Sequence, residues 1–466
     1  MVIRDRLIES VIGSALQDIH DEIGSSLDGL VDYVETDAIR GEHAARARHR
    51  IIAQIVWKKC GSRERKEALL QKAMEKINLT YRLDKIVFDL FIRSDEIVDT
   101  FSTLEGKVKF FETAAQRDPD NVFVLQHFSR MLLREKKLTL ALAQIDSAIT
   151  KDKTKSIRSL HHTRGLVLAE LALTEESDDL ARKWLAQSER EFVHCITAKE
   201  SDDYGHSGLA SLYLAWSRRK KLSVDEGAEY LEKAEATVAK GLRVVREKTA
   251  LLIISSDIQN ELGNQPERIS KLRQAVDGDS ASAIGRYLLA RAYRNQGLPR
   301  KTIEVLEPII TTDFRQVRAY IEYTRAMLEI GESIKKCAAT ISQCRLDGES
   351  DCAFVGLYGG LLFMDGQYAN ATKLWEDAKE QPFSYEERTR KQYIPRDPAD
   401  LSKRMTFTGT IEHAKPGLVL IQPQDGPVLI STQTLVGSTL LQRGHKVSFE
   451  LTFSAKGPFA EHLQIA

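Results

Sequence analysis

The sequence predicts a mainly α-helical protein, a solenoid of stacked helical hairpins followed by a small all-β barrel. Three observations support this fold class. Apolar residues recur at helical spacing from residue 1 to about residue 390. Four glycines, spaced 34, 34 and 35 residues apart, each follow an apolar helical stretch: Gly263, Gly297, Gly331 and Gly366. After residue 405, a period of two replaces the helical period.

Composition excludes several classes of protein. The 466 residues include 67 Lys plus Arg and 67 Asp plus Glu, so the formal net charge is zero. This balance excludes a protein that coats nucleic acid by bulk electrostatics, and it argues against a polybasic membrane-surface protein. No stretch of about 18 apolar residues occurs, and the N-terminus lacks the apolar core of a signal peptide. Five cysteines without a Cys-x-x-Cys motif favour a reducing compartment, so we expect a cytoplasmic protein without membrane contact.

The glycine-spaced hairpins resemble tetratricopeptide (TPR) repeats. In residues 283–316, Ala290 stands where that family has a small residue at the helix crossing, and Leu306 packs from the second helix. In residues 352–385, Gly359 takes the small position and Trp375 is the bulky filler. The resemblance covers about residues 105–385. The units between residues 156 and 248 are longer than the family's length, with second helices expected at about 178–199 and 225–245.

This resemblance implies a superhelix whose concave face is lined by the first helix of each hairpin and binds peptides or partner proteins. By repeat position, the residues expected to line the groove are Phe123, Arg130, Tyr204, Tyr287, Arg291, Arg294, Glu322 and Phe363. Each of them also fits an ordinary solvated helix surface. The Lys and Asn residues with which the family clamps a peptide terminus are not repeated here, so that ligand is not implied.

The first 104 residues are expected to be helical and are divided by charge. Residues 1–37 hold nine acids and two bases, and residues 38–76 hold eleven bases and four acids. Ile3, Leu7 and Val11 begin an amphipathic pattern, and residues 43–53 predict a basic helix that runs into an apolar one. Three interpretations stay open: two helices that pair opposite charges, a basic patch for nucleic acid, and a family resemblance. Arg48-His49-Arg50-Ile51-Ile52-Ala53 resembles the segment after the ATPase core of STAND-type signalling proteins, which often carry TPR sensors.

The C-terminal region changes character at a predicted linker, residues 388–404, which has two prolines within residues 395–398. Strands are expected at residues 406–411, 418–421, 428–431, 445–451 and 460–465, in a five-stranded barrel of the OB-fold type. Residues 409–466 resemble a cold-shock domain. Leucines replace the stacking aromatics of that family at Leu418, Leu420 and Leu429, and His413 stands in place of a Trp. Stacking contributes about 1–3 kcal/mol per base, so we expect weak nucleic-acid binding at most.

The sequence contains no recognisable catalytic set. It has no Gly-x-x-x-x-Gly-Lys-Ser/Thr loop, and Cys337, Cys344 and Cys352 follow repeat spacing, so we interpret them as core residues rather than metal ligands. We therefore expect no enzyme activity, cofactor or metal. The predicted domains are residues 1–104, 105–387 and 405–466, with the linker at 388–404.

Two functions compete. The first is a recognition or scaffold protein that binds a partner protein in its groove, as the sensor part of a bacterial signalling or antiviral defence system. The second is a regulator that binds RNA or single-stranded nucleic acid. The residues expected to contact nucleic acid are His413, Lys415, Lys446, Lys456, Arg396 and Arg404.

Overall fold

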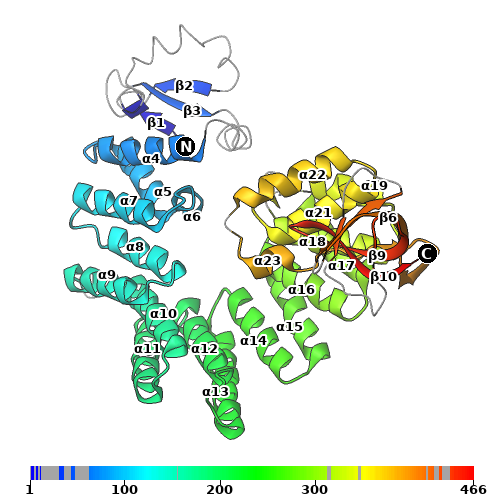
Figure 1. Cartoon of the computed structure of the whole chain (residues 1–466). Coiled ribbons are helices and arrows are strands. Elements are labelled where there is room, and N and C mark those ends of the chain that lie inside the picture. The colour runs from blue at the N-terminus through cyan, green and yellow to red at the C-terminus, as the bar shows by residue number, and fades with distance from the viewer. Residues whose placement is uncertain are drawn as a thin grey trace. The chain divides into compact units, whose positions relative to one another are not determined.

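The computed structural model describes residues 2–4, 7–8, 11, 31–35, 43–47, 62–154, 156–311, 316–344, 348–381, 383–415, 418–424, 430–432 and 441–465. The chain divides into two compact units, Met1–Asn264 (unit 1) and Gln265–Ala466 (unit 2). The protein is mainly α-helical, with paired helices along most of its length and a small β-sheet at the C-terminus (Figure 1).

Unit 1 begins with three short strands and continues as helices. The strands are β1 (Val2–Arg4), β2 (Val31–Glu35) and β3 (His43–Ala47). The helices are α4 (Arg63–Lys76), α5 (Arg82–Arg93), α6 (Asp95–Val98), α7 (Leu104–Arg117), α8 (Val122–Arg134), α9 (Leu138–Lys151), α10 (Arg158–Thr174), α11 (Asp178–Ala198), α12 (Asp203–Ser217), α13 (Val224–Val244) and α14 (Thr249–Glu261). The long second helices predicted near residues 178–199 and 225–245 are confirmed as α11 and α13.

Unit 2 combines helices with strands. Its helices are α15 (Gln265–Gly278), α16 (Ala283–Asn295), α17 (Pro299–Ile310), α18 (Val317–Glu329), α19 (Ile334–Ser342), α21 (Cys352–Met364), α22 (Tyr368–Asp377), the 3-10 turn η1 (Ala378–Glu380) and α23 (Tyr385–Thr389). Its strands are β4 (Arg396–Asp397), β5 (Asp400–Arg404), β6 (Thr406–Lys415), β7 (Leu418–Pro423), β8 (Ile430–Thr432), β9 (Lys446–Ser454) and β10 (Gly457–Ile465).

The repeat-spaced glycines close first helices, as the sequence predicts. All four have a positive φ, between 71° and 82°, which is the left-handed conformation that glycine adopts without strain. After Gly297, the Leu298 N–H donates to the Tyr293 carbonyl at 3.0 Å, the long bond of a Schellman turn. The same turn recurs in residues 132–137, where Lys136 holds the left-handed position with φ 56°.

Small residues at the helix crossings allow the paired helices to approach closely. A Cβ built on Gly359 would lie 2.4 Å from the Trp375 indole nitrogen, so a larger residue there would displace α22. Ala290 is fully buried, and its carbonyl accepts a hydrogen bond from the Thr302 hydroxyl of α17 at 3.0 Å. The predicted packing roles of Ala290, Gly359 and Trp375 are confirmed.

The first helices form the inner row of each stack. In unit 1, α5 contacts α8, α8 contacts α10, α10 contacts α12, and α12 contacts α14. In unit 2, α16 contacts α18 and α18 contacts α21. The second helices mainly contact the helices next to them in the chain. A stack in which the first helices contact one another curves toward these helices. The side of the first helices that faces away from the second helices is therefore the concave face of each unit, which we call its inner face.

Strands are present at all five predicted C-terminal places, although residues 428 and 429 of the third lie outside the described part. They form one small, mainly antiparallel sheet. The neighbours follow the cyclic order β10-β8-β7-β6-β9. All pairs are antiparallel except β8 with β10, which are parallel and share the single pair Ser431 and Phe459.

The sheet shares one hydrophobic core with the last helices of unit 2, from Ala290 to Leu463. Along β9, exposed or half-buried residues alternate with buried ones as far as Glu450, and every residue from Leu451 to Ser454 is buried. The end of β9 is buried on both sides because it also packs against α21. The C-terminal sheet is therefore part of unit 2, and the predicted boundaries at residues 105, 388 and 405 stay predictions.

The expectation of a helical N-terminal region is wrong for its described strands. Residues 31–35 and 43–47, the latter predicted as a basic helix, are β2 and β3, with β1 on the other side of β3. Val31, Tyr33 and Val34 favour strands, and cross-strand pairing outweighs the helix propensity of three alanines in β3. Of the predicted opening helix, Ile3 lies in β1 instead, whereas Leu7, Ile8 and Val11 are helical. Residues 48–61 lie outside the described part.

The segment predicted as a linker, residues 388–404, is folded against the sheet. Pro395 precedes a hairpin and Pro398 lies in its turn: β4 pairs with β5, and the Ala399 N–H donates to the Asp397 carboxylate at 2.9 Å. Tyr393 forms an isolated bridge with Phe453 and is 8% exposed. The sequence also predicts that Pro382 closes the hairpin of residues 352–385, and Pro382 lies outside the described residues.

Candidate protein-binding surfaces

The inner face of unit 1 carries exposed aromatic and basic side chains. On α8, Phe123 is 36% exposed and Arg130, seven residues later on the same side of the helix, is also exposed. On α12, Tyr204 is 55% exposed, and its ring lies 5.2 Å from the His162 ring of α10. The structure therefore places three predicted groove residues, Phe123, Arg130 and Tyr204, on solvent-accessible first helices.

Two histidines of this face are held in the neutral form. Burial, and after it the charges of Arg130 and Arg93, lower the pKa of His127 to about 4. Burial, then Arg130, likewise lowers the pKa of His162 to about 4. Sequence analysis missed Arg93, His127 and His162. His127 lies four residues after Phe123 and three before Arg130, so helical spacing could have placed it on the same face.

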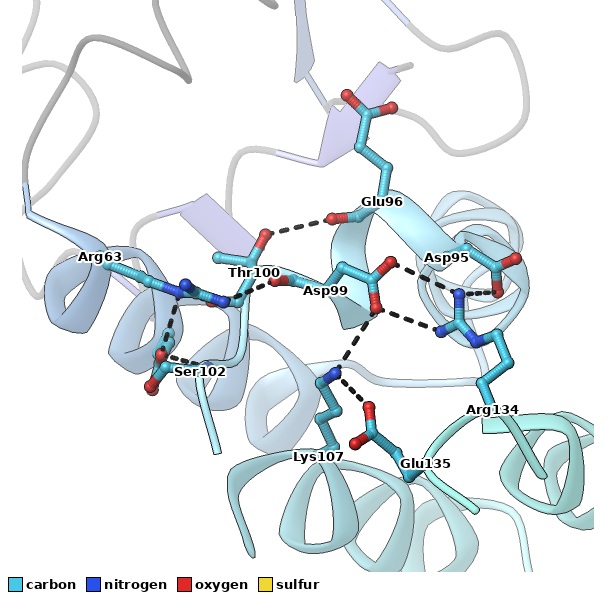
Figure 2. Close-up of polar contacts among 10 residues, drawn as sticks. Arg63, Asp95, Glu96, Asp99, Thr100, Ser102, Lys107, Arg134 and Glu135 are labelled. Carbon is cyan, nitrogen blue, oxygen red and sulfur yellow. Dashed lines mark hydrogen bonds and ion pairs between the residues drawn. The ribbon is translucent and has the colours of Figure 1, made fainter. Parts of the chain in front are cut away.

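The next arginine of α8 is already neutralised. The Arg134 guanidinium lies 3.3 Å from an Asp95 oxygen and 3.2 Å from an Asp99 oxygen (Figure 2). Asp99 also lies 3.6 Å from the Lys107 amine, which in turn lies 2.5 Å from Glu135. These pairs connect the turn around α6 to α7 and α8, so we interpret them as a structural network.

Helix α4 holds the other side of that turn. Arg63 donates to the backbone carbonyls of Thr100 and Asp99, each at 2.9 Å (Figure 2). The Glu67 carboxylate accepts a 2.7 Å bond from the Ser102 N–H. Because polar groups from three helices converge on residues 95–102, Asp95 and Asp99 are positioned by the fold and occupied by their partners.

In unit 2, the inner face is partly open at α16. Tyr287 is half-buried and lines a cavity of about 370 Å³ together with Ile284, Val317, Arg318 and other residues. Arg291 is exposed. The predicted groove residues Arg294 and Glu322 lie 2.5 Å apart. Glu322 is 5% exposed and also pairs with Arg325 at 3.1 Å. Arg294 and Glu322 are thus paired with each other rather than presented to a partner.

The inner face of α21 is covered by the chain itself. A Cβ built on Gly360 would lie 2.7 Å from the Tyr393 ring and 2.8 Å from the Phe453 ring. Phe363 is 5% exposed, and its ring centroid lies 5.3 Å from that of Phe453. The expectation that Phe363 lines an open groove is therefore wrong, because β9 and the segment before β4 pack on this face.

The cover extends toward α18. Arg325 of α18 donates to the Gln392 side-chain oxygen at 2.9 Å. Gln392 itself donates from its backbone N–H to the Phe453 carbonyl at 2.8 Å. Arg325, Gln392 and Tyr393 were not singled out by sequence analysis, and only the apolar character of α21 on all sides indicates that something must cover it.

The basic residues predicted to contact nucleic acid do not form one surface with free charges. Arg404 lies 2.9 Å from Glu450 and 3.5 Å from Glu461, and the Lys456 amine lies 4.0 Å above the Tyr385 ring. Arg396 donates to the Ser402 carbonyl. His413 and Lys446 are exposed on β6 and β9, and of Lys415 only its place in β6 is described.

Neither a metal cluster nor a membrane span occurs in the described residues. They contain no group of three or more His, Cys, Asp or Glu side chains that could hold a metal ion. Cys337 and Cys344 are buried in the core of unit 2, as predicted, and burial raises the pKa of the Cys337 thiol to about 11. Among the helices whose residues are described, none is long and apolar enough to span a bilayer.

Comparisons with known proteins give only distant structural similarities. No protein-family model matches the chain, and no curated protein matches it. A thermophilic TPR protein from Thermus thermophilus matches 50% of this chain and 98% of its own, with 13% identity and a TM-score of 0.35. A tetratricopeptide repeat protein from Parabacteroides merdae matches 63% and 98%, with 14% identity and a TM-score of 0.33. The helical body is TPR-like.

A further similar structure is a STAND signal-transduction ATPase with a TPR sensor from Pyrococcus horikoshii. It matches 81% of this chain and 60% of its own, with 15% identity and a TM-score of 0.32. At such identities and scores, these similarities concern helical architecture alone and indicate no function for this chain.

Proposed function

We propose that this protein is a non-catalytic recognition protein that binds a partner protein on the inner face of unit 1. TPR-like stacks present their first helices as an extended concave surface, which suits binding of a peptide segment or a helix. The open part of the unit 2 face, at Tyr287 and Arg291, is a second contact region of the same kind.

The observation that supports the proposal is the exposure of large side chains on the inner row. Phe123 and Tyr204 remain 36% and 55% exposed although neighbouring first helices are well packed. Exposed aromatic and arginine side chains are the types that contribute most to protein interfaces. Elsewhere on the inner rows, comparable groups are buried by the chain (Phe363) or paired with carboxylates (Arg134, Arg294).

Site-specific photo-crosslinking in the native host tests this proposal. A photoreactive phenylalanine analogue is placed at Phe123 or Tyr204, and at Leu140 or Val193 as controls. Leu140 and Val193 are 52% and 48% exposed but belong to the second helices α9 and α11. We expect one protein to crosslink at the two inner positions and not at the controls. Equal crosslinking at all four positions, or none at the inner positions, would contradict the proposal.

For the C-terminal sheet, we propose an OB fold that serves mainly as part of unit 2. The five-stranded cyclic order with one minimal parallel pairing supports it, since OB folds are partly open five-stranded barrels. Binding of RNA or single-stranded nucleic acid is the alternative function, supported by exposed His413 and Lys446. Titration of labelled single-stranded RNA at two salt concentrations tests it; no binding below about 100 µM at low salt would exclude it.

A more specific proposal is that the chain senses a signal for a bacterial signalling or antiviral defence system. Its support is the sequence resemblance of residues 48–53 to the segment that follows a STAND-type ATPase core. Co-purification of a STAND-type ATPase with the chain from its native host would support this role, and phage sensitivity unchanged by loss of the chain would argue against it.

A further inference from the structure

We propose that the inner face of unit 1 binds an acidic, extended segment of the partner, with carboxylates at Arg93 and Arg130 and apolar side chains on Phe123 and Tyr204. This inference rests on the proposed function and specifies the chemistry of the partner.

The first argument is charge compensation. Arg93 and Arg130 are both exposed, and within the described ranges neither forms an ion pair with a carboxylate. The nearby carboxylates already have partners: Asp95 and Asp99 pair with Arg134, and Asp202 pairs with Arg158. The inner face around α5 and α8 therefore has two positive charges that the fold itself does not neutralise.

The second argument is convergence. Helix α5, which ends at Arg93, contacts helix α8, which carries Arg130. In agreement with this, the charges of both arginines lower the pKa of His127. Arg130 also acts on His162 of α10. Guanidinium groups that converge on one region favour carboxylates, which they bind through two parallel hydrogen bonds.

The third argument is the flanking aromatic surface. Phe123 shares the exposed side of α8 with Arg130, and Tyr204 continues the surface from His162 onto α12. Acidic and apolar side chains that follow one another at every second position share one side of an extended segment, and would reach the arginines and the rings in turn. Charge without aromatic surface would suit a free inorganic anion instead.

Fluorescence anisotropy with the full-length protein tests the inference. The probe is a labelled twelve-residue peptide in which every second residue is in turn glutamate, leucine or phenylalanine and the residues between them are serine. Its control has glutamine at each glutamate position. We expect the glutamate peptide to bind at least about tenfold more tightly, and its affinity to fall with salt. Equal affinity for the two peptides, or no binding of either, would overturn the inference.

Three arginine variants locate the site, with a fourth as a distant control. Arg93→Ala and Arg130→Ala should each weaken binding of the glutamate peptide about fivefold or more. Arg134→Ala, in which the lost charge was already paired, and Arg300→Ala, an exposed arginine on the second helix α17 of unit 2, should change it less than about twofold. A loss as large in Arg134→Ala or Arg300→Ala would overturn the location, once circular dichroism shows each variant folded. If crosslinking at Phe123 and Tyr204 identifies a partner but the glutamate peptide does not bind, the proposed function stands. Only the inference that the partner segment is acidic is then refuted.

Discussion

The inner faces of α8 and α21 use the same helical position in opposite ways. Arg130 and Gly360 are each the ninth residue of a first helix. Arg130 is exposed, whereas Gly360 lies beneath the rings of Tyr393 and Phe453. One stack position can therefore be left open to solvent or be covered by the chain's own C-terminal sheet.

The difference follows from helix composition. Helix α21 is apolar on all sides, and ten of its thirteen residues are buried, from Phe354 to Phe363. A helix with no polar side must be enclosed, and the sheet encloses the side that α19 and α22 leave open. Helix α8 keeps Phe123, His127 and Arg130 on one side and buries the opposite one, so it is stable without a cover. This contrast predicts that substitutions on the inner face of α8 cost little stability, whereas substitutions where the sheet covers α21 cost much.

The largest expected effect is on stability at the covered face. Phe453 is fully buried and stacks on Trp375 and Tyr393, with centroid distances of 6.2 and 5.8 Å. Phe453→Ala should lower the free energy of unfolding by about 3–5 kcal/mol because it leaves a cavity between β9 and α21. Phe123→Ala is the matched control and should change it by less than about 0.5 kcal/mol. Denaturant unfolding measures both, and equal losses would refute the contrast between the two faces.

A smaller effect is expected from pH in unit 1. Burial is the main cause that lowers the pKa of His127 and of His162 to about 4. Burial also lowers the pKa of His206. The unfolded chain, with histidine pKa values near 6.5, binds more protons between pH 6.5 and pH 4, so the stability of unit 1 should fall as pH drops through this window. We expect a loss of about 1–2 kcal/mol for each of His127 and His162.

Hydrogen exchange of individual helices measures this pH effect. The opening free energies of α8 and α10 should decrease from pH 7 to pH 5, and those of α16 and α18, which contain no histidine, should change less. The double variant His127→Gln, His162→Gln should flatten the response of α8 and α10. An unchanged response in that variant would show that other groups cause it.

Sequence alone could predict the local features of these two faces but not their surroundings. Gly263, Gly297, Gly331 and Gly366 mark the turns because the left-handed conformation is a local requirement that glycine meets. The same spacing located Ala290 and Gly359 at helix crossings. It could not show that Phe363 is covered, since the covering residues Tyr393 and Phe453 are about 30 and 90 positions away in the chain.

The errors at the N-terminus have the same origin. In residues 43–47, alanine and arginine have good helix propensity, but β1 and β2 offer backbone partners from distant parts of the chain. Whether an arginine on this face pairs with a carboxylate also depends on contacts between distant parts of the chain. Arg130 and Arg134 look alike in sequence, and only the fold brings Asp95 and Asp99 to one of them.

The smallest expected effect concerns the turn after α8. Lys136 takes the left-handed position, φ 56°, that glycine takes after α16, α18 and α21. A left-handed conformation costs a residue with a Cβ about 1–2 kcal/mol. Lys136→Gly relieves this strain, although the unfolded chain gains freedom and the largely exposed pair with Glu170 is lost. We therefore expect a net gain of about 0.5–1 kcal/mol in the free energy of unfolding.

Two companion variants separate these contributions. Glu170→Gln removes the Lys136 pair without changing the turn and should alter stability by less than about 0.5 kcal/mol. Gly297→Lys introduces the strain at the equivalent turn of unit 2 and should cost about 1–2 kcal/mol. Thermal unfolding of the three variants against the parent chain tests the assignment. A loss of stability in Lys136→Gly, together with a neutral Gly297→Lys, would mean that the closing turns of the two units are not equivalent despite their shared hydrogen-bond pattern.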